Sequence, residues 1–239
     1  MGKNKLQRFA ENTTFGNLFQ PSFTEVFHND FYLKGQWQKK YFGNQHPITI
    51  ELGCGKGEYT LALAAKYPEK NFIGIDIKGA RLWYGAKAAH NNKSTNIAFI
   101  RSRIEFIRSF FSKDEVEEIW ITFPDSQLKK RRIKKRLTSS GFLRSYQTFF
   151  KDNGIIHLKT DNDILYRYTY AIAKKNALPI LQASNNIYSE NIHDEILYTK
   201  TFYEKQHLAK GLTIKYIAFR LPFKVIVEEP DEEIYANKQ

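Results

Sequence analysis

Short apolar runs alternate with stretches of helical periodicity along the middle of this chain, from residue 48 to residue 175. The apolar runs predict five strands, and the stretch after each of them predicts a helix. The expected strands span 48–52, 71–76, 96–101, 116–123 and 154–160, and the expected helices span 58–66, 79–90, 104–110, 138–150 and 161–175. Strands that alternate with helices join into parallel sheets through right-handed crossovers. The pattern therefore predicts an α/β fold, with a mostly parallel sheet and helices on both faces.

The pattern changes after residue 175. Two apolar stretches, 178–188 and 212–221, follow each other without a clear helix between them. Strands that lack a crossover helix pair antiparallel, so we expect an antiparallel C-terminal strand at one edge of the sheet. The segment 201–211 is expected to be a loop.

The two ends of the chain differ from its middle in composition. Residues 1–45 have few apolar runs and several cations near the start, which predicts a partly flexible, basic N-terminal arm. Residues 226–239 contain five acidic residues and form an acidic tail. No linker or repeat interrupts residues 46–225, and this length suits a single domain.

The positive charge of the chain is concentrated in one run. Of the formal net charge of +12, Lys129–Arg136 contribute +7, because seven of these eight residues are cations. A basic run is most often a solvated face, but this one directly follows an apolar strand that ends in Phe123-Pro124-Asp125. Its place beside a strand end favours contact with the phosphates of a nucleic acid.

Several classes of protein are excluded by composition. The single cysteine, Cys54, allows no internal disulfide and no multi-cysteine zinc site, and the six histidines lack metal-ligand spacing. We therefore expect no metal. No apolar stretch is long enough to span a membrane, and the N-terminus lacks the apolar region of a signal peptide. A cytoplasmic protein without a membrane partner is expected.

A glycine-rich loop follows the first expected strand, with the sequence Glu51-Leu52-Gly53-Cys54-Gly55-Lys56-Gly57. Glycines at a strand-to-helix turn let a ligand approach the backbone closely. The dinucleotide fingerprint G-x-G-x-x-G needs glycine at position 58, which is Glu58 here. Asp76 ends the second strand, where a carboxylate can bind both hydroxyls of a ribose. A tight turn with Glu51 as a helix-cap partner is the alternative.

Three further motifs lie near expected strand ends. Asp125 follows the fourth strand, where open α/β sheets place reacting groups, although it could instead form an Asx-turn. Asp161 ends the fifth strand at the same edge of the sheet, and Asp161 or Asp163 could cap the helix that follows. Thr201-Phe202-Tyr203-Glu204 lies in the expected loop, for which an ordinary surface role is the alternative.

These motifs, in this order, resemble those of the bacterial tRNA (guanine-N7-)-methyltransferase family. The resemblance covers about residues 48–221. Its most specific element is the block F-P-D-x-x-x-K-[KR]-R-x-x-K-R-[RL], which is present from Phe123 to Leu137. The E-[IL]-G-x-G-x-G loop, the T-D pair at Thr160-Asp161 and the T-x-[FY]-E motif at 201–204 fall in the expected order.

The resemblance implies a Rossmann-like class I methyltransferase that moves a methyl group from S-adenosylmethionine to N7 of a variable-loop guanine, position 46, in tRNA. S-adenosylhomocysteine would be the product, and no metal would take part. The implied cofactor-binding residues are Glu51, Gly53, Gly55, Asp76, Ser102, Arg103 and Asp125, of which Asp125 is also the implied catalytic residue. The implied substrate contacts are Lys129, Asp161, Thr201, Phe202, Tyr203 and Glu204, and the implied RNA contacts are Arg131, Arg132, Lys134, Lys135 and Arg136.

The chain departs from the family pattern in two places. Ser126-Gln127 stands where the family usually has Pro-Trp, which changes the local shape and the stacking surface after Asp125. Ser102-Arg103 stands where the family commonly has an acid near the adenine, so either residue could border it. The target tRNAs and the choice between monomer and homodimer are left open by the sequence.

The chemistry of guanine N7 sets the expected mechanism. This nitrogen has a free lone pair and no proton, so attack on a sulfonium methyl group needs no base. Catalysis should rest on holding N7 in line with the methyl group and its sulfur. Asp125 would then accept hydrogen bonds from guanine N1–H and the amino group, which disfavours adenine, and would stabilise the cationic product.

Three other functions fit the sequence less well. A methyltransferase that acts on an exocyclic amine typically carries [DNS]-P-P-[YFW] after the fourth strand, and Phe123-Pro124-Asp125-Ser126 does not fit that motif. A non-catalytic basic RNA-binding protein would explain 129–136 but would leave the glycine loop and Asp76 without a role. A nicotinamide dehydrogenase is disfavoured by Glu58.

Overall fold

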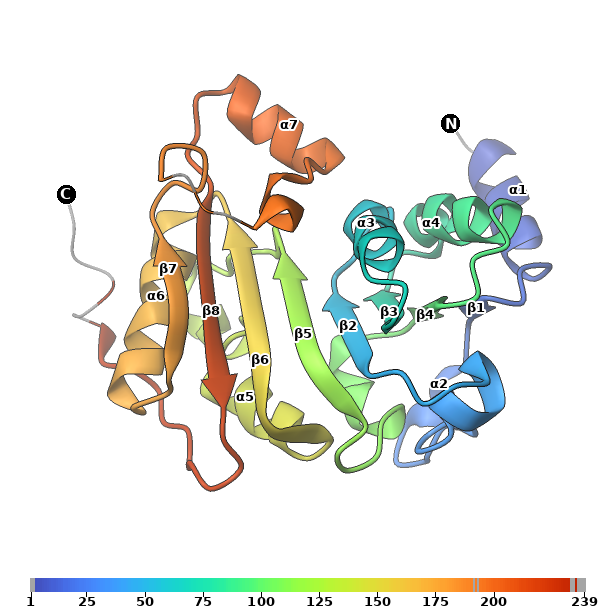
Figure 1. The fold of residues 1–239 in the computed structure, drawn as a ribbon, viewed down its shortest axis with the longest axis horizontal. Helices are drawn as coiled ribbons and strands as arrows, with labels where there is room; N and C mark the ends of the chain where they lie inside the picture. Colours follow the sequence, from blue (N-terminus) through green and yellow to red (C-terminus); the bar gives the residue numbers. More distant parts are fainter. Residues whose placement is uncertain (1–2, 191, 193, 233–234, 236–239) are drawn as a thin grey trace. The chain divides into compact units, whose positions relative to one another are not determined.

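A computed structural model gives the structure of residues 3–190, 192, 194–232 and 235 (Figure 1). The chain divides into two compact units, Met1–Val116 and Glu117–Gln239. Strands alternate with helices in both units, which confirms the α/β class. Parts of the predicted N-terminal arm and acidic tail, at residues 1–2, 233–234 and 236–239, lie outside the described residues.

The first unit is built on four parallel strands in the order β1-β4-β3-β2. Their bounds are Leu18–Phe19 for β1, Ile48–Leu52 for β2, Asn71–Asp76 for β3 and Ile97–Arg101 for β4. Every residue of β2 and β3 is buried, which is typical of parallel strands covered on both faces. Because these strands are parallel neighbours, the segments that follow Leu52, Asp76 and Arg101 begin at the same edge of the sheet.

The helices of the first unit follow its strands along the chain. They are α1 Lys3–Asn12, α2 Phe23–Val26, the π-helix η1 Trp37–Phe42, α3 Glu58–Lys66, α4 Gly79–Asn91 and the 3₁₀-helix η2 Ile104–Ser109. Helix α1 packs on α4, because the Glu11 carboxylate accepts hydrogen bonds from Trp83 at 2.8 Å and from Lys87 at 2.7 Å. Residues 3–42, which belong to the predicted basic arm, contain three of these helices. The 3₁₀-helix η2 takes the place of the α-helix expected at 104–110.

The second unit has its strands in the order β5-β6-β8-β7. Their bounds are Val116–Thr122 for β5, Phe150–Thr160 for β6, Ile180–Ser184 for β7 and Lys215–Leu221 for β8. Strand β8 pairs antiparallel with both β6 and β7. The expected antiparallel pair is therefore present, and β8 lies between β6 and β7, so that β7 takes the outer position.

The helices of the second unit correct three expectations. They are η3 Lys130–Lys135, α5 Ser140–Gln147, α6 Asp163–Lys175, η4 Glu195–Tyr198 and α7 Phe202–Ala209. The loop expected at 201–211 is wrong, because α7 occupies most of it, near the ends of β5 and β6 (Figure 1). The helix expected at 138–150 is shorter, since β6 already begins at Phe150. Neither Asp161 nor Asp163 caps α6, because Asn162 accepts the hydrogen bond from Leu165 N–H.

Candidate active site

The three glycines of the loop between β2 and α3 have two different roles, packing and open access to the backbone. Gly53, Gly55 and Gly57 all have positive φ, at 75°, 58° and 72°, a conformation that other residues adopt only with strain. A Cβ on Gly57 would also lie 2.6 Å from the ring of Phe99, so this glycine is needed for packing. A Cβ on Gly53 or Gly55 would meet nothing within 4 Å. The backbone at these two positions is therefore open to close approach by a ligand.

Asp76 fixes the shape of this loop from the end of β3. Its Oδ2 accepts a hydrogen bond from Gly55 N–H at 3.0 Å, and its Oδ1 accepts one from Lys78 N–H at 2.7 Å. A carboxylate offers about four lone-pair positions, so both oxygens keep acceptor capacity for ligand hydroxyls. The geometry suits a ribose, whose two adjacent hydroxyls need neighbouring acceptors.

Glu51 supplies a second carboxylate at the same end of the first unit's sheet. Its side chain is buried, and its Oε2 accepts a hydrogen bond from the hydroxyl of Thr60. Cys54 lies close to both acids. Burial, together with the negative charges of Glu51 and Asp76, raises the pKa of the Cys54 thiol well above its usual value. This electrostatic environment favours a cationic ligand group.

Ser102 and Arg103 follow β4, next to Asp76. Ser102 is buried, its N–H donates to the Asp76 carbonyl at 3.1 Å, and its hydroxyl donates to the Arg103 carbonyl at 3.2 Å. The side chain of Arg103 is exposed. Of these two residues, Ser102 is the one whose backbone N–H binds Asp76, the acid that in turn holds the glycine loop.

The turn after β5 holds Asp125 between two residues with unusual backbone. Phe123 and Gln127 have positive φ, at 48° and 47°, and such conformations in non-glycine residues often occur at functional sites. Asp125 is exposed, and its Oδ1 accepts a hydrogen bond from Gln127 N–H at 3.1 Å. Asp125 thus forms an Asx-turn, the alternative role that its sequence allows, and its second carboxylate oxygen lies outside the turn.

The basic run divides into exposed cations and one buried cation. The side chains of Lys129, Lys130, Arg131, Arg132, Lys134 and Lys135 are exposed. Arg136 is 1% exposed, and its guanidinium lies over the rings of Tyr168 at 4.4 Å and Tyr235 at 5.4 Å. Its Nε donates to the Ser126 carbonyl at 3.2 Å. Arg136 is one of the expected RNA contacts, but its side chain is buried. It instead holds the turn that carries Asp125.

Residues of the acidic tail contact this part of the second unit. Glu232 forms an ion pair with Lys130 at 2.5 Å, and Asp231 forms one with Lys175 at 3.6 Å. Glu229 accepts hydrogen bonds from Ser140 N–H at 2.9 Å and from the Tyr168 hydroxyl at 2.6 Å. The tail thus neutralises cations at both η3 and the end of α6.

Helix α7 is held by a buried ion pair between Lys159 and Glu204. The ammonium nitrogen of Lys159 lies 2.8 Å from Glu204 Oε2 and also donates to the carbonyls of Leu197 and Thr199. Glu204 Oε1 accepts a hydrogen bond from the Tyr188 hydroxyl at 2.8 Å. Burial lowers the pKa of Lys159, and the charge of Glu204 partly offsets this effect. Both carboxylate oxygens of Glu204 are therefore engaged inside the protein.

The side chains in the first turn of α7 differ in their exposure. Thr201 is the N-cap, and its hydroxyl oxygen accepts from Glu204 N–H. Phe202 is exposed, Tyr203 is half-buried and Glu204 is fully buried. Of the four residues 201–204, the two aromatic rings are the ones available at the surface.

Sequence reasoning did not identify His207, which α7 places beside Asp161. Its Nδ1 lies 3.4 Å from Asp161 Oδ2, and its ring stacks on Phe123 with centroids 5.7 Å apart. The signal was the Thr201–Glu204 spacing, because S/T-x-x-E predicts a helix N-terminus. A helix from residue 202 puts Glu204 and His207, three residues apart, on one face. The structure thus brings Asp161, Phe123 and His207 together in the second unit.

Within residues 3–190, 192, 194–232 and 235, no helix is both long and apolar enough to cross a membrane. In the same described part of the chain, no group of three or more histidine, cysteine or acidic side chains is arranged to hold a metal ion.

Solved structures with a similar fold are methyltransferases. A 30S ribosomal A1408 methyltransferase from an uncultured bacterium matches with a TM-score of 0.56 and 18% identity, over 75% of this chain and 90% of that one. An antibiotic-related methyltransferase matches with a TM-score of 0.54 and 17% identity, over 76% and 90%. The fold is therefore the Rossmann-like fold of class I methyltransferases.

Comparison of sequences narrows this class. Residues 45–217 match the family model described as "Putative methyltransferase". A tRNA (guanine-N(7)-)-methyltransferase from Bacteroides thetaiotaomicron is 47% identical, over 98% of this chain and 92% of the relative. One from Christiangramia forsetii is 51% identical, over 92% and 98%. The chain belongs to the tRNA (guanine-N7-)-methyltransferase family.

Proposed function

We propose that this protein transfers the methyl group of S-adenosylmethionine to N7 of a guanine in tRNA, at position 46 of the variable loop. The observation that carries the proposal is the identity of 47% and 51%, over nearly the whole chain, with relatives named tRNA (guanine-N(7)-)-methyltransferase. These names do not include position 46, which is part of the proposal. The carboxylates and open glycine backbone of the first unit fit the chemical groups of the cofactor. A cytoplasmic location is part of the same proposal.

The first unit would hold the cofactor. Gly53 and Gly55 leave room for it beside their backbone, and Asp76 offers acceptors for the ribose hydroxyls. The negative charge of Glu51 suits the amino group of the methionine moiety. Ser102 would border the adenine, with Arg103 as the alternative. When bound, S-adenosylmethionine supplies an electrophilic methyl group on a sulfonium centre.

The second unit would hold the guanine. Asp125 has a carboxylate oxygen outside its turn, and we assign to it the guanine N1–H and amino group, together with a contact to the cofactor. Asp161 and Lys129 would contact the nucleotide, and Phe202 and Tyr203 would form the nearby surface, with Thr201 as the N-cap of their helix. Glu204 and Arg136 are assigned positioning roles instead of direct contact, because both are buried.

The exposed cations of the basic run would bind the tRNA backbone. They are Arg131, Arg132, Lys134 and Lys135. Release of counterions from the phosphates makes such binding strongly dependent on salt. Exposed lysine and arginine side chains on a short 3₁₀-helix can contact an RNA backbone without reading its bases.

The proposed reaction needs no proton transfer at N7. The N7 lone pair forms the new carbon–nitrogen bond while the carbon–sulfur bond breaks, and the bonding pair remains on sulfur. The products are a cationic 7-methylguanosine and S-adenosylhomocysteine. The protein contributes alignment of the two reactants and a carboxylate, Asp125, near the new positive charge.

Methylation of unmodified tRNA transcripts with radiolabelled cofactor tests the proposal. The labelled nucleoside should be 7-methylguanosine at position 46. A transcript with 7-deazaguanosine at this position, which has a carbon in place of N7, should take up no label. Label in an adenosine, in an exocyclic amine or at another guanine would contradict the proposal.

A further inference from the structure

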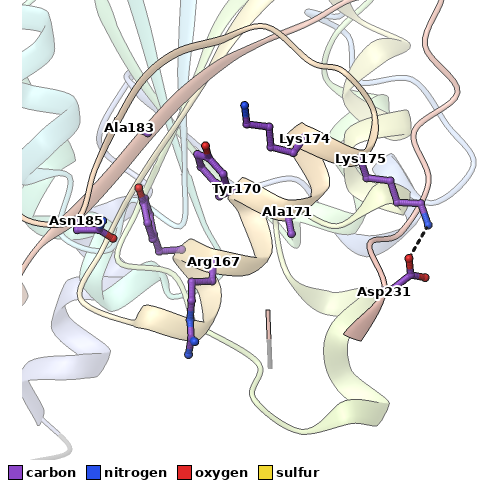
Figure 2. A pocket seen from close by; sticks show the side chains of 9 residues that line it. Arg167, Tyr170, Ala171, Lys174, Lys175, Ala183, Asn185 and Asp231 are labelled. Carbon is purple, nitrogen blue, oxygen red and sulfur yellow. Dashed lines mark ion pairs between the residues drawn. The ribbon is translucent and has the colours of Figure 1, made fainter. Parts of the chain in front are cut away.

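A pocket of about 720 Å³ lies against α6 in the second unit, and nothing in the proposed reaction uses it (Figure 2). Its lining includes Tyr166, Arg167, Tyr170, Lys174, Lys175 and Asp231. Positions 166, 170 and 174 recur every four residues and positions 167, 171 and 175 do the same, so two adjacent rows of one helix face the pocket. The volume lies within the range of small-ligand sites.

The side chains around this pocket combine aromatic surface with positive charge. In Figure 2, Tyr170 and Lys174 leave α6 on one side and Arg167 leaves it on the other, with Ala171 between them. Tyr170 is 37% exposed, so part of its ring is open to contact from outside the protein. The Lys174 ammonium lies 5.6 Å from the centre of that ring. An exposed ring beside cations is the arrangement that proteins use to stack a base next to its phosphate.

Arg167 gives a second, independent sign of a ligand. Among the described residues, its Nε is one of the few side-chain donors that are buried without a hydrogen-bond partner. A buried donor without a partner costs stability, and a phosphate that draws the half-buried Arg167 side chain further into the pocket would supply the missing acceptor. Guanidinium groups are well suited to phosphate oxygens because their donors lie in one plane.

Two neighbouring residues of the acidic tail link the pocket to the basic run. Asp231 pairs with Lys175 at the pocket, and the next residue, Glu232, pairs with Lys130 of η3. Consecutive residues are only about 3.8 Å apart along the chain. A polyanion bound to the basic run can therefore extend to α6, where its phosphates would compete with the tail carboxylates for the same cations.

We propose that Tyr166, Arg167, Tyr170 and Lys174 form a second RNA-binding surface, which takes one unstacked nucleotide of the tRNA outside the methylation site. The base stacks on Tyr170, one phosphate binds Lys174 on the same side of α6, and the neighbouring phosphate binds Arg167 on the other side. Asp231 opposes this binding through its charge. This inference rests on the proposed function, because it takes tRNA as the bound RNA.

The base contact is tested with unmodified tRNA by fluorescence anisotropy. Loss of one stacked base weakens binding about 5- to 150-fold, so we expect this change in Kd for Tyr170→Ala. Tyr170→Phe keeps the ring and should bind like the wild type. Asp231→Asn should bind more tightly. Wild-type affinity in Tyr170→Ala, or equal losses in Tyr170→Ala and Tyr170→Phe, would overturn the stacking contact.

The phosphate contact is tested by its salt dependence. Arg167→Gln combined with Lys174→Gln should lower the slope of log Kd against log salt by about 1.4–1.8, the value for two phosphates. Lys113→Gln combined with Lys224→Gln removes the same charge from exposed positions elsewhere and should leave the slope unchanged. Equal changes in both double variants would overturn the site, because they would reflect net charge alone.

Photocrosslinking locates the contact without a mutation. In the wild-type protein, 4-thiouridine-substituted tRNA should crosslink to the tryptic peptide 168–174, which lies between Arg167 and Lys174. Crosslinks confined to other peptides would overturn the proposal. A wild-type protein that does not bind tRNA would overturn the proposed function as well, whereas one that binds and methylates tRNA without using α6 would overturn this surface alone.

Discussion

The ammonium group of Lys159 and the carboxylate of Glu204 form an ion pair of 2.8 Å in which both side chains have no exposed surface. The pair joins the end of β6 to the first turn of α7. One turn further along α7, His207 lies beside Asp161. We infer that the pair fixes the position of α7 near Asp161, because moving the helix away would leave a buried charge without its partner.

Removal of the negative charge from this pair should destabilise the protein. Glu204→Gln keeps the shape of the side chain but leaves Lys159 charged and buried, which costs about 3–5 kcal/mol in the free energy of unfolding. Urea denaturation measures this change. The double variant Lys159→Met with Glu204→Leu should recover part of it, since the uncompensated charge is gone. A change below about 1 kcal/mol in Glu204→Gln would contradict the positioning role.

The loss of stability in Glu204→Gln should become smaller as the pH rises. Burial lowers the pKa of folded Lys159, so below pH 10.4 there is a window in which the unfolded chain binds more protons than the folded one. Stability rises with pH in such a window. Without Glu204 the folded pKa falls further and the window widens. The difference between variant and wild type in urea midpoint should therefore shrink as pH rises towards 10, and a constant difference would argue against the buried ammonium.

Arg136 and its neighbour Lys135 should behave differently although both belong to the basic run. Lys135→Gln removes an exposed cation and should lower the salt slope of tRNA binding by about 0.7–0.9 without affecting turnover at saturating tRNA. Arg136→Lys loses the planar guanidinium over Tyr168 and the bond to Ser126, so turnover should fall while the salt slope stays unchanged. Single-turnover rates measure the effect on turnover, and fluorescence anisotropy measures the salt slope. A normal rate in Arg136→Lys would contradict its positioning role and favour direct contact with RNA.

The sequence predicted the bounds of β2, α3 and β3 without error, because apolar runs and glycines mark them clearly. It missed α7, whose buried position is the charged Glu204, so that hydrophobic periodicity gives no signal there. It also grouped Arg136 with its neighbours. The burial of Arg136 depends on Tyr168 and Tyr235, which are distant along the chain, and local sequence carries no information on such contacts.

The cofactor site can be tested at Asp76. Asp76→Ala removes acceptors for the ribose hydroxyls as well as the bonds to the Gly55 and Lys78 N–H groups. Charge-assisted hydrogen bonds contribute about 1.5–3 kcal/mol, so the Kd for S-adenosylmethionine should rise about 10- to 150-fold in calorimetric titration. Glu69→Gln removes an exposed carboxylate from the same unit and serves as the control. Equal affinities in the two variants would exclude Asp76 from the site.

Asp125 decides the mechanism, and Asp125→Asn separates its charge from its structural role. The asparagine oxygen can still accept from Gln127 N–H, so the turn between the two positive-φ residues should persist. If the carboxylate stabilises the cationic product, single-turnover rates should fall about 100-fold or more, beyond any loss of tRNA or cofactor affinity.

The pH profile of the same two proteins tests whether the reaction includes a proton-transfer step. N7 has no proton to remove, so the wild-type rate should be flat across neutral pH, and the variant should show the same flat profile at a lower level. A wild-type rate that changes across neutral pH would contradict the absence of proton transfer from the rate-limiting step. If Asp125→Asn keeps the wild-type rate and only Asp125→Ala loses it, Asp125 acts as a turn residue, and the charge near the product must come from another group such as Asp161.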